Sequence, residues 1–536
     1  MRILQVVHGL PPYEWAGAEL VTLHLAQALR KRGHEVTVFT RAAGAGEEFS
    51  VREEHYEGLR VVRVLNNYTY HTSFRLFYDN SFFHDPFLRL LDQTGPDIVH
   101  FQHLAHLSVN LLPLAAALGY PTVLSLHDFF FPCERIHLID ARMRLCPGPD
   151  RGERCVPCLQ ERATAEEARR RFFYMEDILQ AADRILTPSR FLAERMECYF
   201  PVLRGQLQTV PLGIKAVPRL AVRHAPGMPL RILCIGVLMP HKGAHLLIEA
   251  LRGLPTGALE VSFYGTVVPF WRDYVDRLRE AAHGLAVRFS GSYPHDQLAT
   301  ILAQYDVLVV PALCEETFSL VAREAFMAGL PVVAARQGAL LEVVQDEVNG
   351  LFFEPGNAAD LRRCLWRLLT EPGLWARLHA HATETQVKTL EAYTEEIEQV
   401  YVAVRNNAKC RGGAQAGADL HRLTATRHVV VGLSRENMSL RREHARCHQA
   451  LAVSEQERLR LQQEREQVQQ EWERTLSALR RQEELLGARE AELQQYSARL
   501  AAIYASTTWK LYQGYAFLRD SLVRRPLRTV RQWLSK

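Results

Sequence analysis

The stretch Cys314–Val333 reads CEETFSLVAREAFMAGLPVV and follows DVLVVP at Asp306–Pro311. The DVLVVP run has the length and the β-branched residues of a buried strand. Ser319 is then a candidate N-cap, and Gly329 with the proline two residues later marks the end of an apolar helical pattern. The segment predicts a strand, a loop, a helix and a further strand at Pro331–Ala335.

Two glutamates flank the start of this helix. We expect Glu316 on the loop after the first strand and Glu324 on the second turn of the helix, at the edge where open parallel sheets bind ligands. A carboxylate there can accept hydrogen bonds from the vicinal hydroxyls of a ribose or hexose. The backbone amides of Thr317, Phe318 and Ser319 can point at an anion. The alternative is that both acids only complement the dipole of an ordinary helix start.

The alternation of strands and helices covers most of the chain and restarts once. Helical patterns separate apolar runs of strand length at Arg2–Leu10, Gly33–Thr40, Asp97–His103, Pro121–Asp128, Arg184–Ser189, Leu230–Leu238, Glu260–Gly265 and Ala286–Gly291. This order predicts an α/β protein with two doubly wound, Rossmann-like domains facing across a cleft. We place the domains at 1–210 and 230–385, with a Pro- and Gly-rich linker at 211–229 and a closing helix at 386–405.

A different composition begins near residue 406. We expect a flexible spacer at 406–434, whereas 435–505 is rich in Glu, Gln, Arg and Leu and contains no proline. Apolar residues recur in this segment every seven positions, which predicts a long helix and a coiled coil able to form a homodimer. These residues are Trp472, Leu479, Leu486, Leu493 and Leu500. A single solvated helix is the alternative.

Positive charge is concentrated at the carboxyl end. Trp509–Lys536 contains seven Lys or Arg and one Asp, although the 536-residue chain carries a formal charge of only +4. Aromatic and basic residues mixed over 506–536 predict an amphipathic tail that binds an anionic membrane surface or a partner protein. The rest of the chain gives no case for nucleic-acid binding. Since the sequence shows neither a secretory signal nor a run of about 18 apolar residues, we expect a cytoplasmic protein, peripheral on the inner face of the membrane.

A glycine-containing turn follows another predicted strand, in CIGVLMPHKGAHLLIEAL at Cys234–Leu251. Gly236 permits a diphosphate to approach the backbone, Lys242 supplies a positive charge, and the following helix adds its N-terminal dipole. Most turns of this kind have no ligand, so this pattern alone is weak.

Four cysteines lie in a loop at 131–160, with Pro and Gly between them. They are Cys133, Cys146, Cys155 and Cys158. Four thiolates within about 26 residues suit a tetrahedral structural zinc site. Reduced free thiols and disulfides are the alternatives, and disulfides fit a cytoplasmic protein least.

Together these motifs resemble the family-4 glycosyltransferases, retaining enzymes of the GT-B fold, over roughly residues 1–405. The segments that carry the resemblance are EETFSLVAREAFMAGLPVVA, QGALLEVVQDEVNGLFFEPGN (Gln337–Asn357), VPLGI, HKG and AGAELVTLHLAQALRKRGHEVTVFT (Ala16–Thr40). The end of the chain, a coiled coil followed by S-x-x-W-K, resembles that of bacterial surface-polysaccharide transferases.

The resemblance implies roles for individual residues near the donor. Glu324 should hold the ribose of a nucleoside diphosphate, and Glu316 should contact the transferred sugar near the reaction centre. Lys242 and the amide after Gly236 should hold the diphosphate. These roles match the chemistry expected above from the residues alone.

The same resemblance implies roles for two further residues, and at one position this chain departs from the family pattern. Gly17 should let an N-terminal loop approach the donor, and His127 should face the donor sugar as a catalytic residue. Val237 stands where many members have a phosphate-binding arginine. Transfer in the family is usually drawn as front-face attack, in which a phosphate oxygen takes the acceptor proton. Because the chain has no Asp-x-Asp, no catalytic metal is implied.

The expected function is retaining transfer of a sugar from a nucleoside-diphosphate donor to a glycan or lipid-linked glycan in cell-surface polysaccharide synthesis. Two alternatives differ in class. One is a non-catalytic coiled-coil scaffold of a glycan-synthesis complex, and the other is a sugar-nucleotide epimerase on the same fold.

Overall fold

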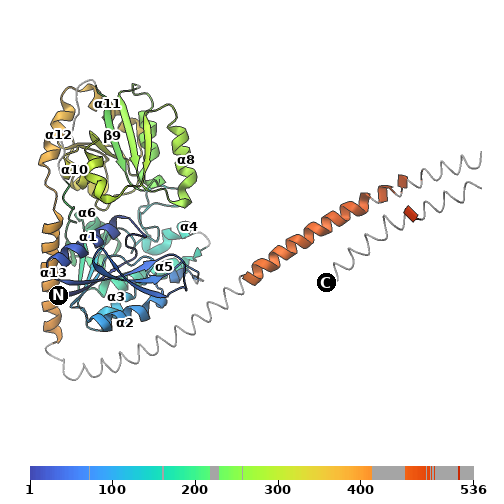
Figure 1. The fold of residues 1–536 in the computed structure, drawn as a ribbon, viewed down its shortest axis with the longest axis horizontal. Coiled ribbons are helices and arrows are strands. Elements are labelled where there is room, and N and C mark those ends of the chain that lie inside the picture. The colour runs from blue at the N-terminus through green and yellow to red at the C-terminus, as the bar shows by residue number, and fades with distance from the viewer. Residues whose placement is uncertain are drawn as a thin grey trace, which may run out of the picture. The chain divides into compact units, whose positions relative to one another are not determined.

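The computed structural model describes residues 1–412, apart from 70, 72, 160–161, 218–227 and 256, and then 453–478 with a few positions beyond. The chain divides into two compact units, Met1–Arg442 and Glu443–Lys536. The first unit contains two lobes, each built on its own β-sheet (Figure 1). We call them the N-terminal lobe (residues 1–209) and the C-terminal lobe (residues 230–384).

The N-terminal lobe is built on an eight-stranded sheet in the order β3-β4-β2-β1-β5-β6-β7-β8. Neighbouring strands are parallel, except that β3 pairs antiparallel with β4. The strands are β1 (Arg2–Val7), β2 (Glu35–Ala42), β3 (Val51–Tyr56), β4 (Leu59–Leu65), β5 (Ile98–Phe101), β6 (Thr122–Ser125), β7 (Arg184–Thr187) and β8 (Leu207–Thr209). The winding reverses at β1, between β2 and β5, and ligands bind beside such switch points.

The C-terminal lobe has an all-parallel, six-stranded sheet in the order β11-β10-β9-β12-β13-β14. Its strands are β9 (Leu230–Ile235), β10 (Leu259–Tyr264), β11 (Val287–Gly291), β12 (Val307–Val310), β13 (Val332–Ala335) and β14 (Gly350–Phe353). The switch point lies between β9 and β12. The loops expected to hold a ligand follow these two strands.

Helices cover both sheets, which is why the central strands are apolar on both faces. Every residue of β12 and β13 is buried. The N-terminal lobe contains α1 (Gly17–Lys31), α2 (His84–Thr94), α3 (Leu111–Ala117), α4 (Val156–Leu159), α5 (Ala165–Gln180) and α6 (Arg190–Tyr199). The C-terminal lobe contains α7 (Ala244–Leu251), α8 (Arg272–Ala281), α9 (Leu298–Leu302), α10 (Leu320–Ala328), α11 (Ala358–Thr370) and α12 (Leu374–Glu384).

The last helix of the first unit, α13 (Leu390–Gly412), returns to the N-terminal lobe and runs along its side (Figure 1). Its apolar residues join the core under α1. Tyr401 is fully buried, and its hydroxyl lies 2.7 Å from His100 Nδ1 of β5. At the surface, Glu398 pairs with both Arg32 and His34. α13 therefore ties the end of the C-terminal lobe to the other sheet, and it extends beyond the expected closing helix at 386–405 into the expected spacer.

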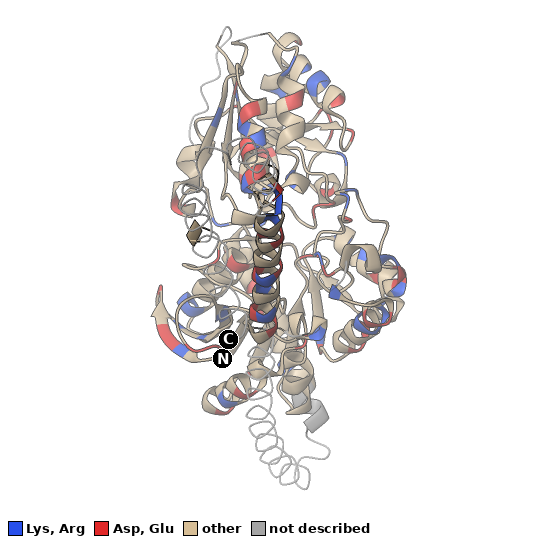
Figure 2. Ribbon diagram, turned by 90° about the vertical axis from the view of Figure 1, so that its right-hand side faces the viewer, with Lys and Arg blue, Asp and Glu red and all other residues tan. Residues whose placement is uncertain are grey.

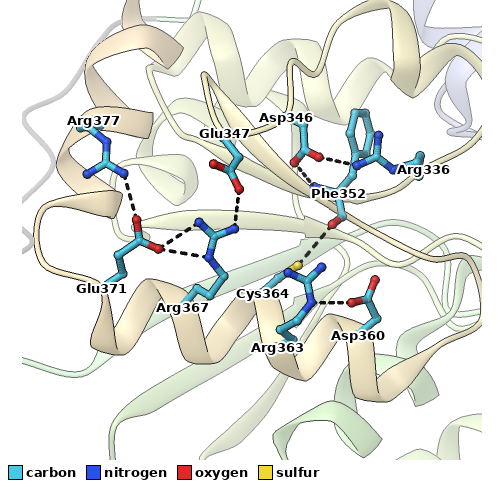
Figure 3. Close-up of polar contacts among 10 residues, drawn as sticks. All are labelled: Arg336, Asp346, Glu347, Phe352, Asp360, Arg363, Cys364, Arg367, Glu371 and Arg377. Carbon is cyan, nitrogen blue, oxygen red and sulfur yellow. Dashed lines mark hydrogen bonds and ion pairs between the residues drawn. The ribbon is translucent and has the colours of Figure 1, made fainter.

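Charged side chains form a network beside β14, the edge strand of the C-terminal sheet (Figure 3). The Asp346 carboxylate accepts a hydrogen bond from the backbone amide of Phe352, 3.0 Å away, and also pairs with Arg336. On α11, Arg367 pairs with Glu347 and with Glu371. Each such surface pair contributes little stability, and the bond from Phe352 to Asp346 gives one backbone amide of this edge strand a partner.

The predicted fold class is confirmed, since every strand predicted from an apolar run is present. Four strands were not predicted: β3, β4, β8 and β14. The sequence of β3, VREEHY, is mostly exposed, so it lacks the apolar run used to find the others. β8 has three residues, and β14 lies inside a segment recognised only through its resemblance.

The second unit is described by itself and only in part. Residues 453–478 form a helix whose described side chains are almost all exposed, Trp472 among them. The other heptad residues, at 479, 486, 493 and 500, lie outside the described residues, as does the tail at 506–536 except for residues 517–518. The predicted coiled coil and amphipathic tail therefore stay predictions. Among the described residues, no helix combines the length and the apolar character needed to cross a membrane.

Lys and Arg are interspersed with Asp and Glu over the face shown in Figure 2. This mixture of charges agrees with the sequence, in which the excess of positive charge belongs to the tail.

Candidate active site

The loop after β12 brings most of the predicted residues to the switch point of the C-terminal lobe. Ser319 occupies the N-cap position of α10, but its backbone is left-handed (φ 58°) and its side chain makes no capping hydrogen bond. The Ser319 hydroxyl is buried without a hydrogen-bond partner. Ser319 is therefore at the predicted N-cap position, but the predicted capping hydrogen bond is absent. A capping side chain requires an extended backbone at this position.

Lys242 and Glu316 form an ion pair, with Nζ 2.7 Å from Oε1. Lys242 ends a short 3-10 turn after β9, and Glu316 lies on the loop after β12, so the pair joins the two strands at the switch point. Burial lowers the pKa of Lys242, but the charge and hydrogen bond of Glu316, with smaller contributions from neighbouring groups, together outweigh burial and raise that pKa overall. The lysine is therefore charged at neutral pH, in the position where a parallel sheet offers an anion site.

Two glycines shape the backbone around Lys242. A Cβ at Gly243, which has φ 75°, would lie 1.8 Å from the carbonyl oxygen of Pro311, so only glycine lets this turn pack against the end of β12. At Gly236 (φ 151°), a Cβ would meet no atom within 4 Å. The space that a side chain at Gly236 would occupy is therefore open.

Glu324, on α10, is buried and lies 3.2 Å from His295 Nε2. His295 follows β11, and its ring lies 5.2 Å from the ring of His24 on α1 of the other lobe. Burial, with a smaller contribution from His295, lowers the pKa of His24 to about 4. The sequence predicted Glu324 but neither histidine, since a lone histidine has no recognisable pattern.

Gly17 is the first residue of α1, and a Cβ there would lie 3.3 Å from Leu320 Cδ1 at the start of α10. The first turns of α1 and α10 therefore meet across the two lobes. Gly17 therefore lies beside the start of α10, directly after the loop that carries Glu316, and its predicted approach to the donor stays a prediction.

His127, two residues after the end of β6, contacts the same loop. Its Nε2 donates to the side-chain oxygen of Gln102 (2.9 Å), and its carbonyl oxygen accepts a hydrogen bond from Thr317 Oγ1 of the other lobe (2.6 Å). Burial, with a smaller contribution from His103, lowers the pKa of His127 to about 4. The imidazole is therefore neutral at pH 7.

The hydrogen bond from Thr317 is one of several that join the lobes. Ser189 Oγ donates to the Thr317 carbonyl oxygen (2.6 Å), and Arg195 pairs with Glu315. Glu342 accepts a hydrogen bond from the backbone amide of Phe191 in the first turn of α6 (2.6 Å). The loop after β12 is thus fixed to the N-terminal lobe on both sides of Glu316.

Phe318 was expected to offer its amide to an anion, and its side chain has a separate, structural position. The ring is buried in the core beneath α1, with the Arg323 guanidinium 3.6 Å above its centroid. The same guanidinium donates to the Phe318 carbonyl oxygen. Arg323 therefore holds the backbone of the loop that leads into α10.

The edge of the N-terminal sheet carries two histidine–carboxylate pairs that the sequence did not predict. His8 Nε2 lies 3.1 Å from Glu19, and His103 Nε2 donates to Asp128 (2.9 Å). The two imidazole rings lie 4.2 Å apart. Burial raises the pKa of Asp128, but its hydrogen bond and electrostatic interaction with His103, together with a hydrogen bond from the backbone of Phe130, outweigh burial and lower that pKa to about 2. His8 directly follows β1, and Asp128 lies three residues after the end of β6, and this position was their one sequence signal.

Several polar atoms around these pairs are buried without a hydrogen-bond partner. They are His8 Nδ1, Glu14 Oε2, Glu19 Oε2, Arg41 Nε, both ring nitrogens of His71, and His106 Nδ1. Leaving one such atom unpaired costs about 1–3 kcal/mol, so a group of them marks a place where a polar ligand or water completes the structure. His100, in contrast, has contacts to Ser125 and Tyr401 on its two ring nitrogens and is a core residue.

The four cysteines of the loop at 131–160 are free thiols that line one cavity of about 20 Å³. Among the described residues, no group of three or more His, Cys, Asp or Glu is arranged to hold a metal ion. The structure thus gathers the four predicted cysteines around one space without showing a formed metal site.

Two family profiles match the chain, one for each lobe. Residues 15–216 match Glycosyltransferase Family 4, and residues 221–385 match Glycosyl transferases group 1. Together the two matches span more than half of the chain.

Among curated proteins, the chain is 28% identical over 293 residues to a D-inositol 3-phosphate glycosyltransferase of Nocardia farcinica, a match that covers 50% of this chain and 62% of that protein. It is 26% identical over 434 residues to a glycogen synthase of Mycobacterium tuberculosis, covering 76% and 96%.

Among solved structures, sucrose-phosphate synthase from Thermosynechococcus elongatus has a TM-score of 0.58 and 20% identity, covering 75% of this chain and 98% of that one. Anabaena Alr3699/HepE in complex with UDP and glucose has a TM-score of 0.53 and 18% identity, covering 74% and 98%. At these identities the likeness concerns the fold.

Proposed function

We infer that this chain, which belongs to the GT-B glycosyltransferases of family 4, binds a nucleoside-diphosphate sugar between its lobes and transfers the sugar with retention of configuration. One observation carries the inference: a charged lysine and a carboxylate, Lys242 and Glu316, meet at the switch point of the C-terminal sheet. Gly17 and His127 approach the same loop from the other lobe.

In this proposal the diphosphate lies over the open backbone at Gly236 and against Lys242. It competes with Glu316 for the lysine, which leaves Glu316 free to accept hydrogen bonds from hydroxyls of the transferred sugar. Glu324, buried on α10, accepts hydrogen bonds from the ribose hydroxyls. The amides of Thr317 and Ser319 lie near the first turn of α10, whose dipole favours the anion.

Transfer then depends on positioning and charge. Lys242 stabilises the negative charge that develops on the leaving diphosphate, while the neutral His127 lies beside the sugar and orients its hydroxyls. The acceptor hydroxyl attacks from the face that the diphosphate leaves, and a phosphate oxygen takes its proton. We assign no step to a metal ion because the chain has no Asp-x-Asp, and we expect activity to persist in EDTA.

The acceptor side of the proposal is the edge of the N-terminal sheet. The pairs His8–Glu19 and His103–Asp128, with the unpartnered polar atoms around them, suit a molecule rich in hydroxyl groups. A glycan or lipid-linked glycan of cell-surface polysaccharide synthesis has this chemistry. Lipid linkage would also account for a basic, aromatic tail that binds the inner face of a membrane.

The proposed activity is tested by incubating the full chain with a panel of UDP-, ADP- and GDP-sugars and following release of the nucleoside diphosphate. Glu316→Gln should lower turnover of the preferred donor on the order of 10²-fold, since it removes the charge that faces the sugar and Lys242. Glu371→Gln, the same change in the surface network of α11, is the matched control and should have no effect. Equal activity of Glu316→Gln and wild type would exclude this site as the donor site.

A non-catalytic scaffold and an epimerase predict other results. A scaffold would release no nucleoside diphosphate from any donor, and an epimerase would convert the sugar without releasing it. The paired, charged state of Lys242 and Glu316 favours an active transferase.

A further inference from the structure

The loop between β6 and α5 contains little regular structure, yet it lies beside the candidate active site. It begins directly after His127 and Asp128, and the ring of His137 in this loop lies 4.4 Å from the ring of His241, the residue before Lys242. Among its described residues, the helical segments are a short 3-10 turn at Asp150–Cys155 and α4. A loop of this length needs an additional constraint to hold a fixed shape.

Four thiols offer such a constraint. Cys133, Cys146, Cys155 and Cys158 come from separate parts of the loop and line one cavity together with apolar side chains, among them Leu138. At about 20 Å³, the cavity holds one water-sized species. None of the four thiols is in a disulfide. The other described cysteines, such as Cys198 on α6 and Cys364 on α11, do not line this cavity.

Arg171 on α5 provides the second observation. Its side chain is buried, with 4% of the residue exposed, and it donates from Nη1 to the Phe131 carbonyl oxygen (3.1 Å) and from Nη2 to that of Phe130 (2.7 Å). Its Nε has no hydrogen-bond partner. In the part of the chain that the structure describes, no carboxylate forms an ion pair with Arg171, although a buried charge requires a counter-charge.

The missing counter-charge lies on the side of the cysteines. The groups that act electrostatically on Arg171 are Cys133, Glu134 and Cys155, with Tyr78 contributing least. Glu134 is already paired with Arg162, 2.9 Å away. The Arg171 guanidinium also lies over the rings of Tyr78 and Phe130, 5.5 and 5.6 Å from their centroids, but neither ring carries a negative charge.

We propose that Cys133, Cys146, Cys155 and Cys158 bind one zinc ion as thiolates and that Arg171 is the counter-charge of this site. The four thiols release four protons to solvent and form four Zn–S bonds, so the bound site carries a net charge of −2 beside a buried guanidinium. Because the side chains are not yet arranged to hold an ion, binding requires the thiols to turn into the cavity. The bound ion then fixes the shape of the loop, and with it the position of His137 against His241.

The test is metal analysis of the full chain, purified after expression with added zinc and dialysed without chelator. About one zinc per chain is expected, released by a mercurial reagent that modifies thiols. The double variant Cys155→Ser, Cys158→Ser should lose the metal, and Cys198→Ser, which alters an exposed thiol elsewhere, should retain it. A chain without zinc whose thiols all react freely would overturn the proposal, as would iron in place of zinc or metal retained by the double variant.

A second measurement uses only the wild-type chain, so it does not depend on the folding of a variant. Cobalt added to the zinc-free protein should give the visible absorption bands of tetrahedral cobalt–thiolate coordination. A spectrum of octahedral cobalt would contradict the four-thiolate site. Both measurements are independent of the donor and the acceptor, so they can fail while the proposed glycosyl transfer stands.

Discussion

The two sheet edges that face each other in the candidate active site differ in how far their polar groups are satisfied. At the edge of the C-terminal sheet, Lys242 is paired with Glu316, and Glu324 lies against His295. The side chains expected to hold the donor there have partners, although the Ser319 hydroxyl and His241 Nε2 are buried without one. At the edge of the N-terminal sheet, His8 and Glu19 each keep a buried polar atom without a partner.

This difference suggests a division of tasks. The edge of the C-terminal sheet, where the charged side chains are paired, is largely formed before a ligand arrives. It suits the ribose and diphosphate of the donor, which many nucleotide sugars share. The unsatisfied edge requires a ligand or water to complete its hydrogen bonds, and it would discriminate most against an acceptor that lacks a matching hydroxyl. We therefore expect substitutions at the first edge to reduce turnover of any donor, and substitutions at the second edge to act on the choice of acceptor.

The largest expected effect is that of Lys242→Ala. Removing the positive charge from the diphosphate site should lower kcat/KM for the preferred donor about 10²–10³-fold, as removal of one electrostatic stabiliser does in other active sites. Because Val237 supplies no second positive charge in this loop, the loss of kcat/KM should fall at the upper end of this range. Steady-state release of the nucleoside diphosphate measures it, with the exposed Lys31→Ala as control. A loss below threefold would mean that the diphosphate lies elsewhere.

Glu19→Gln should have a smaller effect that differs between the two half-reactions. The ratio of transfer to hydrolysis of the donor should fall about tenfold or more, because a hydrogen bond from the acceptor molecule to a charged carboxylate is worth about 1.5–3 kcal/mol. Donor hydrolysis should fall far less. Quantifying both products in one reaction checks this, beside Glu35→Gln at the exposed start of β2. Parallel loss of both activities would contradict the division of tasks.

Acidification should destabilise the folded chain in part through His127, at the edge of the N-terminal sheet. Burial lowers the pKa of His127 to about 4, from an ordinary value near 6.5. The unfolded chain therefore binds a proton in this range before the folded chain does, and the free energy of unfolding falls as pH drops from about 6.5 towards 4. Between pH 7 and 5, His127 should account for roughly 1–2 kcal/mol of this loss.

Urea unfolding of wild type and His127→Gln at pH 7 and 5 measures this effect, and the variant should lose less stability than wild type over the same interval. An equal loss in both proteins would show that the proton is taken up elsewhere, for instance at His24 or His106.

Thr317→Val should have the smallest effect. It removes the hydrogen bond from Thr317 Oγ1 to the His127 carbonyl oxygen, the contact that joins the two edges, and a neutral hydrogen bond is worth about 1 kcal/mol. We expect a loss in kcat of about fivefold with little change in the donor KM. Thr370→Val, which removes a threonine hydroxyl on α11 from a local bond to Trp366, is the control. An unchanged kcat would mean that this contact does not position His127.

The comparison also explains what could be predicted from the sequence. Glu316 and Lys242 are 74 residues apart, yet both could be predicted because each follows an apolar run at the same edge of a parallel sheet. His8, Glu19 and Asp128 could not, because single polar residues without fixed spacing gain meaning only from the fold that gathers them. Ser319 shows a further limit of prediction from sequence. Its N-cap position could be predicted, but its left-handed backbone conformation could not.

The central claim is that the pair Lys242–Glu316 is the donor diphosphate site, and a crystal structure of the chain with UDP tests it most directly. The account predicts UDP between the lobes, with a phosphate oxygen within hydrogen-bond distance of Lys242 Nζ and the ribose hydroxyls at Glu324. UDP bound away from both residues, with the ion pair unchanged at 2.7 Å, would contradict it.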